Sequence, residues 1–484
     1  MAVKCKLASY YLPGLYVEDY SIEVPLDWRG LEPAALASGR MALPTTSAIP
    51  GAAPTLKLFY RVACAPENVG RNLPLLIYLQ GGPGGESPRP TSSTDGGWLA
   101  DALKRFRVVL PDQRGCGRSS RVDGPVIACV GERAAATGAD SACAQAAYLK
   151  RFLASSIVCD FEYLRLAAFG GAPWVALGQS YGGFLALTYL SFFPEGIAAG
   201  FACGGIPHVP GSAEEVYAHT FPRMAHKTRS WYARYPEDEE RMGALADYVA
   251  AHDVRLPDGS PLTVARLQTL GQGMGMKPYA ERLHNLLDLA FAGSDGTVPA
   301  NGTAGLRLSE GFLMSALSTL SQAGRPLYWT LQEFIYADGS RPVAPIRWAA
   351  AREYAARPEF SPTARPFMLT GEAAFPWMFD AELGDPALKP FAAAMDALME
   401  DTDFDPIYDA ARLVANAVPL YAAVYFDDVY VDSGLQLDTL SRMGAAHPWI
   451  TNEFEHDGLR TGKVFKRLLD EALAAGDLLT AATG

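Results

Sequence analysis

The sequence predicts an α/β fold in which a mostly parallel sheet is covered by helices and carries an inserted, mainly helical cap. Strand-like and helix-like segments alternate from about residue 55 to 203, and loops follow the carboxyl ends of the strands. Residues from about 210 to 410 are mostly helix-like, and a strand pattern returns at 418–425. We therefore expect a sheet domain built from residues 1–208 and 415–484, with a cap domain at 209–414.

The individual elements follow from period-two alternation, apolar runs and the turn residues that bound them. Two alternating strands are expected at 20–24 and 56–62, on either side of a loop near 33–54 that is rich in Ala, Pro, Ser and Gly. Further strands are expected at 75–79, 108–110, 174–177, 198–203 and 418–425, and helices at 160–168, 181–193 and 461–475.

The segment from Gly178 to Gly182 has the sequence GQSYG and directly follows the apolar run 174–177. This GxSxG pattern is common by chance, but an apolar strand before it and an apolar helix after it are the context of a nucleophile elbow. In such an elbow the chain turns sharply from strand to helix, and small glycines leave room for a strained, accessible serine. Ser180 is therefore the predicted nucleophile of a serine hydrolase.

A serine hydrolase of this kind needs a carboxylate and then a histidine later in the chain, each beyond the end of a strand. Asp427 and Asp428 close the apolar run 418–426, and His456 lies 28 positions after Asp428. The order Ser, Asp, His is that of the α/β-hydrolase fold. We favour Asp428 as the acid, although the sequence leaves Asp427 open.

An acyl intermediate also needs amide donors for its oxyanion, one of them from the residue after the nucleophile. The glycine-rich segment Gly81–Gly85 follows the strand 75–79 and can present a second amide close to the substrate. We predict that the amides of Gly82 and Tyr181 form this oxyanion hole. Another glycine-rich segment, Gly271–Gly275, lacks the spacing and the preceding strand of a dinucleotide loop, so we interpret it as a turn in the cap.

Composition narrows the function classes. The 484-residue chain has a net charge of −12, which argues against nucleic acid or an anionic membrane surface as a partner. Its seven cysteines include no CxxC pair and its histidines show no metal-ligand spacing, so we expect no disulfide framework and no metal. The N-terminus lacks a signal-peptide pattern, and a cytoplasmic location is expected.

Three motifs carry a resemblance to a known family. Residues 80–84 (QGGPG), 112–119 (DQRGCGRS) and 178–183 (GQSYGG) resemble, in this order, motifs of the proline iminopeptidases, or prolyl aminopeptidases, of the α/β-hydrolase superfamily. With the Asp428 and His456 regions, the resemblance extends from about residue 55 to the end of the chain. Gln80 departs from the pattern, because the family has a histidine there.

The resemblance implies removal of an N-terminal residue, preferably proline, from small peptides, without a cofactor. It also implies that cap glutamates bind the free amino group of the substrate. Glu333 and Glu372 lie in the two segments that look similar to those of the family. A partly buried pair of carboxylates would favour a cationic amine and leave a blocked terminus unpaired.

Two other functions use the same residues. A carboxylesterase or amide hydrolase would have the same Ser–His–Asp triad without requiring a free amino terminus, since fold and triad do not fix the substrate. An inactive binding module on the same fold would need none of these groups to react. The sequence leaves the oligomeric state open, a homo-oligomer included.

Overall fold

The structure is a computed structural model and describes residues 4–292 and 306–478. Its centre is a nine-stranded sheet with the order β1-β2-β3-β5-β4-β6-β7-β8-β9. Strands β5 to β9 and β4 run parallel to one another, whereas β1, β2 and β3 join them as antiparallel neighbours at one edge. The strands are β1 (Cys5–Leu12), β2 (Leu15–Pro25), β3 (Thr55–Cys64), β4 (Leu75–Leu79), β5 (Arg107–Pro111), β6 (Trp174–Gln179), β7 (Ile197–Cys203), β8 (Leu420–Tyr425) and β9 (Ala446–Thr451).

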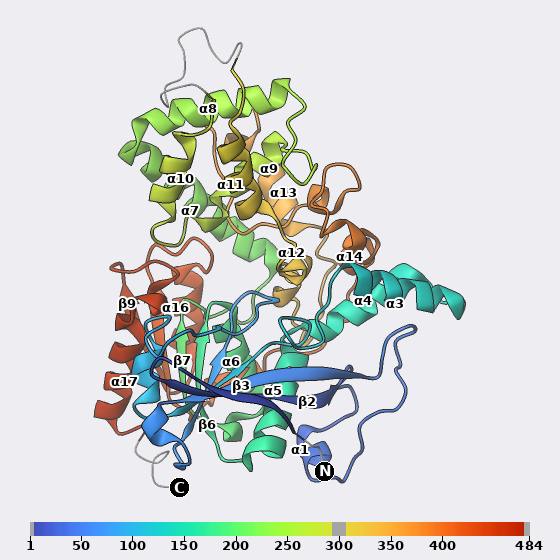
Figure 1. Cartoon of the computed structure of the whole chain (residues 1–484), viewed down its shortest axis with the longest axis vertical. Coiled ribbons are helices and arrows are strands. Elements are labelled where there is room, and N and C mark those ends of the chain that lie inside the picture. Colours follow the sequence, from blue (N-terminus) through green and yellow to red (C-terminus); the bar gives the residue numbers. More distant parts are fainter. Residues whose placement is uncertain (1–3, 293–305, 479–484) are drawn as a thin grey trace.

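The central strands are apolar on both faces because helices cover both sides of the sheet. Alternate side chains of one strand enter different cores: Ala176 of β6 packs in one, whereas Val175 and Leu177 pack in the other. The helices of the sheet domain are α1 (Pro33–Ala37), α2 (Leu99–Leu103), α3 (Gly124–Ala136), α4 (Ser141–Leu149), α5 (Ala154–Phe169), α6 (Tyr181–Phe192), α16 (Ser433–Arg442) and α17 (Lys463–Ala475). Helices α5 and α6 cover one face, and α2 and α17 cover the other. Helices α3 and α4 project sideways from the sheet (Figure 1).

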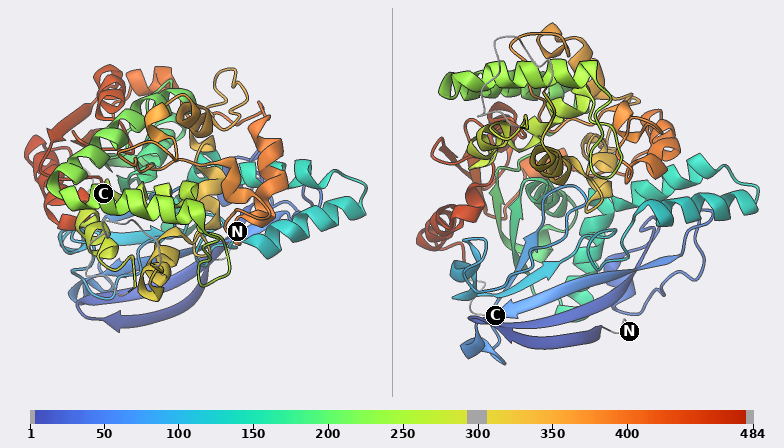
Figure 2. Two further views of the ribbon diagram at one scale, coloured as in Figure 1. Left: turned by 90° about the horizontal axis from the view of Figure 1, so that it is seen from above. Right: turned by 45° about the horizontal axis from the view of Figure 1, so that its top comes forward.

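The chain between β7 and β8 is mainly helical and lies over the carboxyl ends of the parallel strands (Figures 1 and 2). Its helices are α7 (Ala213–Arg234), α8 (Pro236–Ala251), α9 (Val264–Gln268), α10 (Tyr279–Leu287), α11 (Glu310–Leu320), α12 (Pro326–Leu331), α13 (Ala349–Ala355), α14 (Ala392–Met399) and α15 (Ala410–Val414). Its two parts differ in packing. Helices α8, α10 and α11 share a core of their own, whereas α12 to α14 belong to the same core as α5 and α6. None of the described helices is long and apolar enough to cross a membrane.

The strands and helices expected from the sequence are all present, with longer bounds in several cases. The helix expected at 160–168 extends over Ala154–Phe169, because its polar residues are paired inside the protein: Asp160 binds Arg114, and Glu162 binds Arg165. Strands β1 and β9 and helices α3, α4 and α16 are additional to the expectation. The fold is the α/β-hydrolase fold with an inserted helical cap; the exact domain boundaries stay a prediction.

Candidate active site

Ser180 occupies a sharp turn between β6 and α6. Its backbone has φ 56° and ψ −127°, a conformation that side-chain-bearing residues rarely adopt. The surrounding glycines permit this turn, since a Cβ on Gly182 would lie 1.9 Å from the carbonyl oxygen of Leu79. A Cβ on Gly178 would likewise lie 2.3 Å from the Gly182 oxygen. Ser180 remains partly exposed, so a substrate can reach it.

The predicted acid and base form a buried hydrogen-bonded pair. His456 Nδ1 lies 2.7 Å from Asp428 Oδ2, while Asp428 Oδ1 accepts the amides of Tyr430 and Val431 at 2.9 and 3.0 Å. Asp427 is exposed, in contrast to Asp428. Burial would lower the pKa of His456, but the charge of Asp428, their hydrogen bond and the charge of Glu372 outweigh it, and the net shift is upward.

The sheet topology brings these residues to the same edge. Strands β6, β7, β8 and β9 are consecutive neighbours, and Ser180, Asp428 and His456 follow β6, β8 and β9 respectively. The side-chain amide of Gln179, next to Ser180, donates to the His456 carbonyl at 3.3 Å. The loop after β7 lies between Ser180 and Asp428. A Cβ on Gly205 would lie 2.0 Å from the Ser180 backbone, and a Cβ on Gly204 would lie 3.3 Å from Asp428 Oδ2.

The predicted oxyanion loop lies against the elbow. Leu79 of β4 pairs with Gly178 of β6, so the loop that follows β4 starts beside the turn at Ser180. A Cβ on Gly81 would lie 3.1 Å from the Ser180 Cβ, and Gly82 has φ +133°. Tyr181 is the first residue of α6, and the first amides of a helix have no partner within it. The Tyr181 amide therefore lies at the N-terminus of α6, the positive end of the helix dipole.

The DQRG segment braces this loop at both ends. The Gln113 side-chain amide donates to the Gln80 carbonyl at 2.7 Å, and Asp112 Oδ1 accepts the Ser87 amide at 3.1 Å. Arg89 forms a bidentate pair with Asp112 at 2.8 and 2.5 Å. Sequence reasoning identified this motif only through its resemblance; the contacts give its physical role, which is to fix the loop that follows β4.

The two predicted cap glutamates differ in their surroundings. Both carboxylate oxygens of the buried Glu333 accept backbone amides, from Ala349 at 2.9 Å and Ala350 at 3.0 Å, at the start of α13. Burial raises the pKa of Glu333 to about 7, although these amides oppose the shift. Glu372 is partly exposed and accepts a hydrogen bond from the Tyr328 hydroxyl. Burial raises its pKa too, against the opposing charge of His456.

Burial raises the pKa of Tyr217, and the negative charges of both glutamates raise it further. Its buried hydroxyl has no hydrogen-bond partner in the described part of the chain. The two carboxylates and this hydroxyl together form a polar group on the cap side of the site.

The loop after β8 and the cap also contact the histidine, through residues that were not predicted from the sequence. The ring of Tyr430 packs edge-on against His456, with 4.8 Å between ring centroids. Its hydroxyl donates to the Gln272 carbonyl at 2.6 Å and accepts the Gly275 amide at 2.9 Å. The Gly275 carbonyl then accepts the His456 amide at 3.0 Å. Gly271–Gly275 is thus a turn in the cap, as expected, that also holds the histidine loop; its run of glycines was the available signal.

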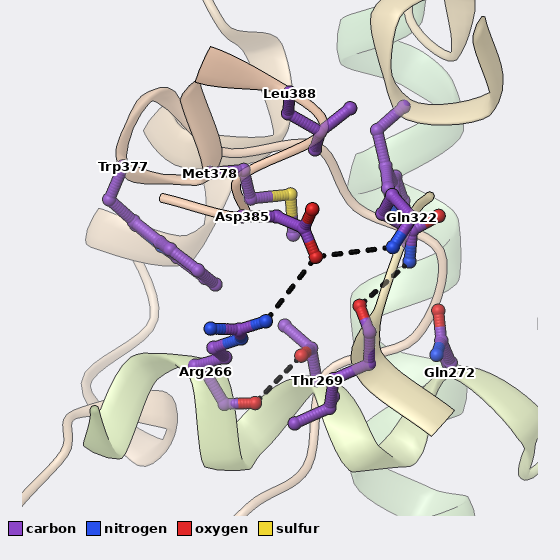
Figure 3. Close-up of a pocket in the computed structure, with 10 residues that line it drawn as sticks. Arg266, Thr269, Gln272, Gln322, Trp377, Met378, Asp385 and Leu388 are labelled. Carbon is purple, nitrogen blue, oxygen red and sulfur yellow. Dashed lines mark hydrogen bonds and ion pairs between the residues drawn. The ribbon is translucent and has the colours of Figure 1, made fainter. Parts of the chain in front are cut away.

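A pocket inside the cap is lined in part by Gln272 of this turn (Figure 3). Its lining also includes Trp329 and Trp377. Arg266 pairs there with Asp385 at 3.3 Å, and Asp385 also accepts the Gln322 amide at 3.1 Å (Figure 3). None of the predicted site residues lines this pocket. Its polar groups bind one another, which stabilises the segment that carries Gln272.

Known proteins similar to this chain support one family. The family model for the alpha/beta hydrolase fold matches residues 74–238. A proline iminopeptidase of Aeromonas sobria is 37% identical over 455 residues, which are 93% of this chain and 95% of the relative. A proline iminopeptidase of Aspergillus aculeatus is 30% identical over 418 residues, 84% of this chain and 86% of the relative. The chain therefore belongs to the proline iminopeptidase family of the α/β hydrolases.

Proposed function

We propose that this protein is a serine aminopeptidase that releases an N-terminal residue, preferably proline, from small peptides. The observation that carries the proposal is the buried pair of Asp428 and His456 beside a strained, partly exposed Ser180, with the carboxylate of Glu372 acting on the same imidazole. Ser180, His456 and Asp428 suit acyl transfer. The carboxylate of Glu372 suits recognition of a cationic amine.

The reaction would proceed through an acyl-enzyme. Ser180 Oγ attacks the carbonyl carbon of the N-terminal residue while His456 Nε2 takes the hydroxyl proton. The oxyanion that forms accepts hydrogen bonds from the amides of Gly82 and Tyr181. The C–N bond then breaks, and His456 returns the proton to the leaving amine. A water molecule, activated by His456, releases the amino acid from Ser180.

Asp428 would hold the imidazole with Nδ1 protonated and Nε2 directed at the serine. Its second oxygen accepts two backbone amides, which fixes the carboxylate in place. Glu333 and Glu372 would bind the substrate ammonium group, with the free Tyr217 hydroxyl as a further acceptor. The seven unpaired cysteines suit a reducing compartment, and we place the protein in the cytoplasm.

The first test removes the nucleophile. Ser180→Ala should lower kcat on a proline aryl amide by roughly 10⁴-fold or more, because the acyl-enzyme cannot form. Ser191→Ala is the matched control, since Ser191 lies in α6, the helix that follows Ser180, and its hydroxyl donates to the Leu187 carbonyl. Circular dichroism checks that both variants are folded. Wild-type activity in Ser180→Ala would overturn the proposal.

The second test concerns the amino group. Glu372→Gln should lower kcat/KM for a proline aryl amide by about 10- to 100-fold, the worth of a charge-assisted hydrogen bond. Hydrolysis of p-nitrophenyl acetate, which has no amine, should change little. Glu310→Gln, at an exposed position of α11, is the control for the loss of one charge. Equal losses on both substrates, or full turnover of an N-acylated proline aryl amide, would instead indicate an esterase or general amide hydrolase.

A further inference from the structure

A second pocket lies where the oxyanion loop meets the cap. Its lining includes Gly84, Cys116, Arg121, Arg325 and Leu327. Gly84 and Leu327 are in close contact across it, since a Cβ on Gly84 would lie 2.7 Å from the Leu327 Cβ. The pocket thus begins two residues beyond Gly82, on the side of the loop that faces the start of α12.

One aromatic side chain joins this pocket to the amine-binding carboxylate. The guanidinium of Arg325 lies 5.2 Å from the centre of the Tyr328 ring, and the Tyr328 hydroxyl donates to Glu372. Arg325 is close enough to Glu372 to favour the ionised carboxylate. A cationic group therefore lies over the ring of Tyr328, and an anionic group lies at its hydroxyl.

The charged side chains that line the pocket differ in whether they have hydrogen-bond or ion-pair partners. Glu86 pairs with Arg89 at 3.4 Å, and one nitrogen of Arg121 donates to the carbonyls of Ala323 and Gly324 at 2.9 and 3.0 Å. Arg121 thereby fixes the segment that presents Arg325. Arg325 itself is exposed and forms no ion pair with any described residue. The pocket offers a free guanidinium to an anionic ligand.

We propose that Arg325 binds the C-terminal carboxylate of the substrate, so that the enzyme prefers dipeptides with a free carboxyl group. This inference rests on the proposed aminopeptidase function. An extended chain spans about 3.3–3.6 Å per residue, so the two charged ends of a dipeptide are roughly 7 Å apart. This length matches a tyrosine side chain with a carboxylate at its hydroxyl and a guanidinium over its ring. A guanidinium binds a carboxylate through two parallel hydrogen bonds.

The experiment compares three substrates that share the N-terminal proline: Pro-Ala, Pro-Ala amide and a proline aryl amide. For the wild-type protein kcat/KM should be about 10- to 100-fold higher on Pro-Ala than on Pro-Ala amide, because only the acid can pair with Arg325. Arg325→Gln should remove this difference between the acid and the amide. Arg325→Lys, which retains the charge, should keep part of the preference.

Arg282→Gln is the matched control, because Arg282 is an exposed arginine of α10 and lines neither pocket described above. It should behave as the wild type on all three substrates. Equal kcat/KM of the wild type on Pro-Ala and its amide would overturn the carboxylate proposal, and so would an equal loss on both in Arg325→Gln. Absence of wild-type activity on the proline aryl amide would instead contradict the proposed function itself.

Discussion

Three carboxylates act on the imidazole of His456. Asp428 binds it directly, and the charges of Glu372 and Asp457 add to its effect, so all three favour the protonated ring. A general base must be neutral to accept the proton of Ser180. The rise in the His456 pKa therefore moves the acidic limb of the activity profile to higher pH. The carboxylate that we propose binds the substrate amine would thus also weaken the base at low pH.

This coupling predicts a change in pH dependence. Glu372→Gln removes a charge that raises the His456 pKa, so the acidic limb of kcat/KM should move to lower pH. The profile should be measured with p-nitrophenyl acetate, whose binding does not depend on an amine. Glu310→Gln should leave the limb in place. A shift to higher pH, or none, would contradict the coupling.

Residue types and order were sufficient to select the candidate nucleophile, acid and base. The choice of Asp428 over Asp427 and the separation of the glutamates required coordinates, because both depend on burial and partners. The contacts of Tyr430 and Gly275 with the histidine segment were not predicted, since a tyrosine in the loop after β8 and a glycine in a cap turn have no motif that connects them to His456. The same holds for Tyr328, which contacts Glu372 from another segment of the cap.

The loop after β4 depends on an element that does not contain the site. Gln113, in the loop after β5, donates to the Gln80 carbonyl at 2.7 Å, and β4 lies between β5 and β6 in the sheet. Gln113→Ala should lower kcat about tenfold with little change in KM, because one hydrogen bond of about 1.4 kcal/mol positions an amide that acts in the transition state. Steady-state kinetics on a proline aryl amide would separate the two constants.

Gln145→Ala provides the matched control for this positioning role. Gln145 is also buried, and its side-chain amide donates to the Ile127 carbonyl at 2.8 Å, in the α3–α4 projection. It should lose a similar amount of stability while kcat stays unchanged. A fall in kcat of equal size in both variants would mean that Gln113 acts only through overall stability.

Elements with strong periodicity were predicted well, and those that depend on distant contacts were not. The strand expected at 75–79 has the observed bounds of β4, whose apolar run lies between helices on both faces. Helices α3 and α4 were missed because alanine-rich stretches show little contrast between faces. Their buried sides pack on each other and against the cap, through contacts of α4 with α14 and of α3 with the segment Lys389–Phe391.

At the scale of the whole molecule, the order of the chain and the packing of the hydrophobic cores divide the protein at different places. The expected cap domain 209–414 is one insertion in the sequence, yet α12 to α14 share a core with α5 and α6, and α8, α10 and α11 form a separate core. Cooperative units follow shared burial rather than chain order. We therefore expect an energetic boundary close to residue 320, inside the expected cap domain.

Hydrogen exchange at low denaturant concentrations measures this boundary. Amides of α14 should open with the same free energy as those of α5, whereas amides of α10 and α11 should open at a lower free energy. Leu245→Ala, at a buried position of α8 in the separate core, should lower the opening free energy of α10 and α11 by about 2–5 kcal/mol and leave α14 unchanged. Leu164→Ala, at a buried position of α5, should lower the opening free energies of α5 and α14 together. If α14 instead opened with α10 and α11, the cap would be one cooperative unit, and the boundaries expected from the sequence would also be the energetic ones.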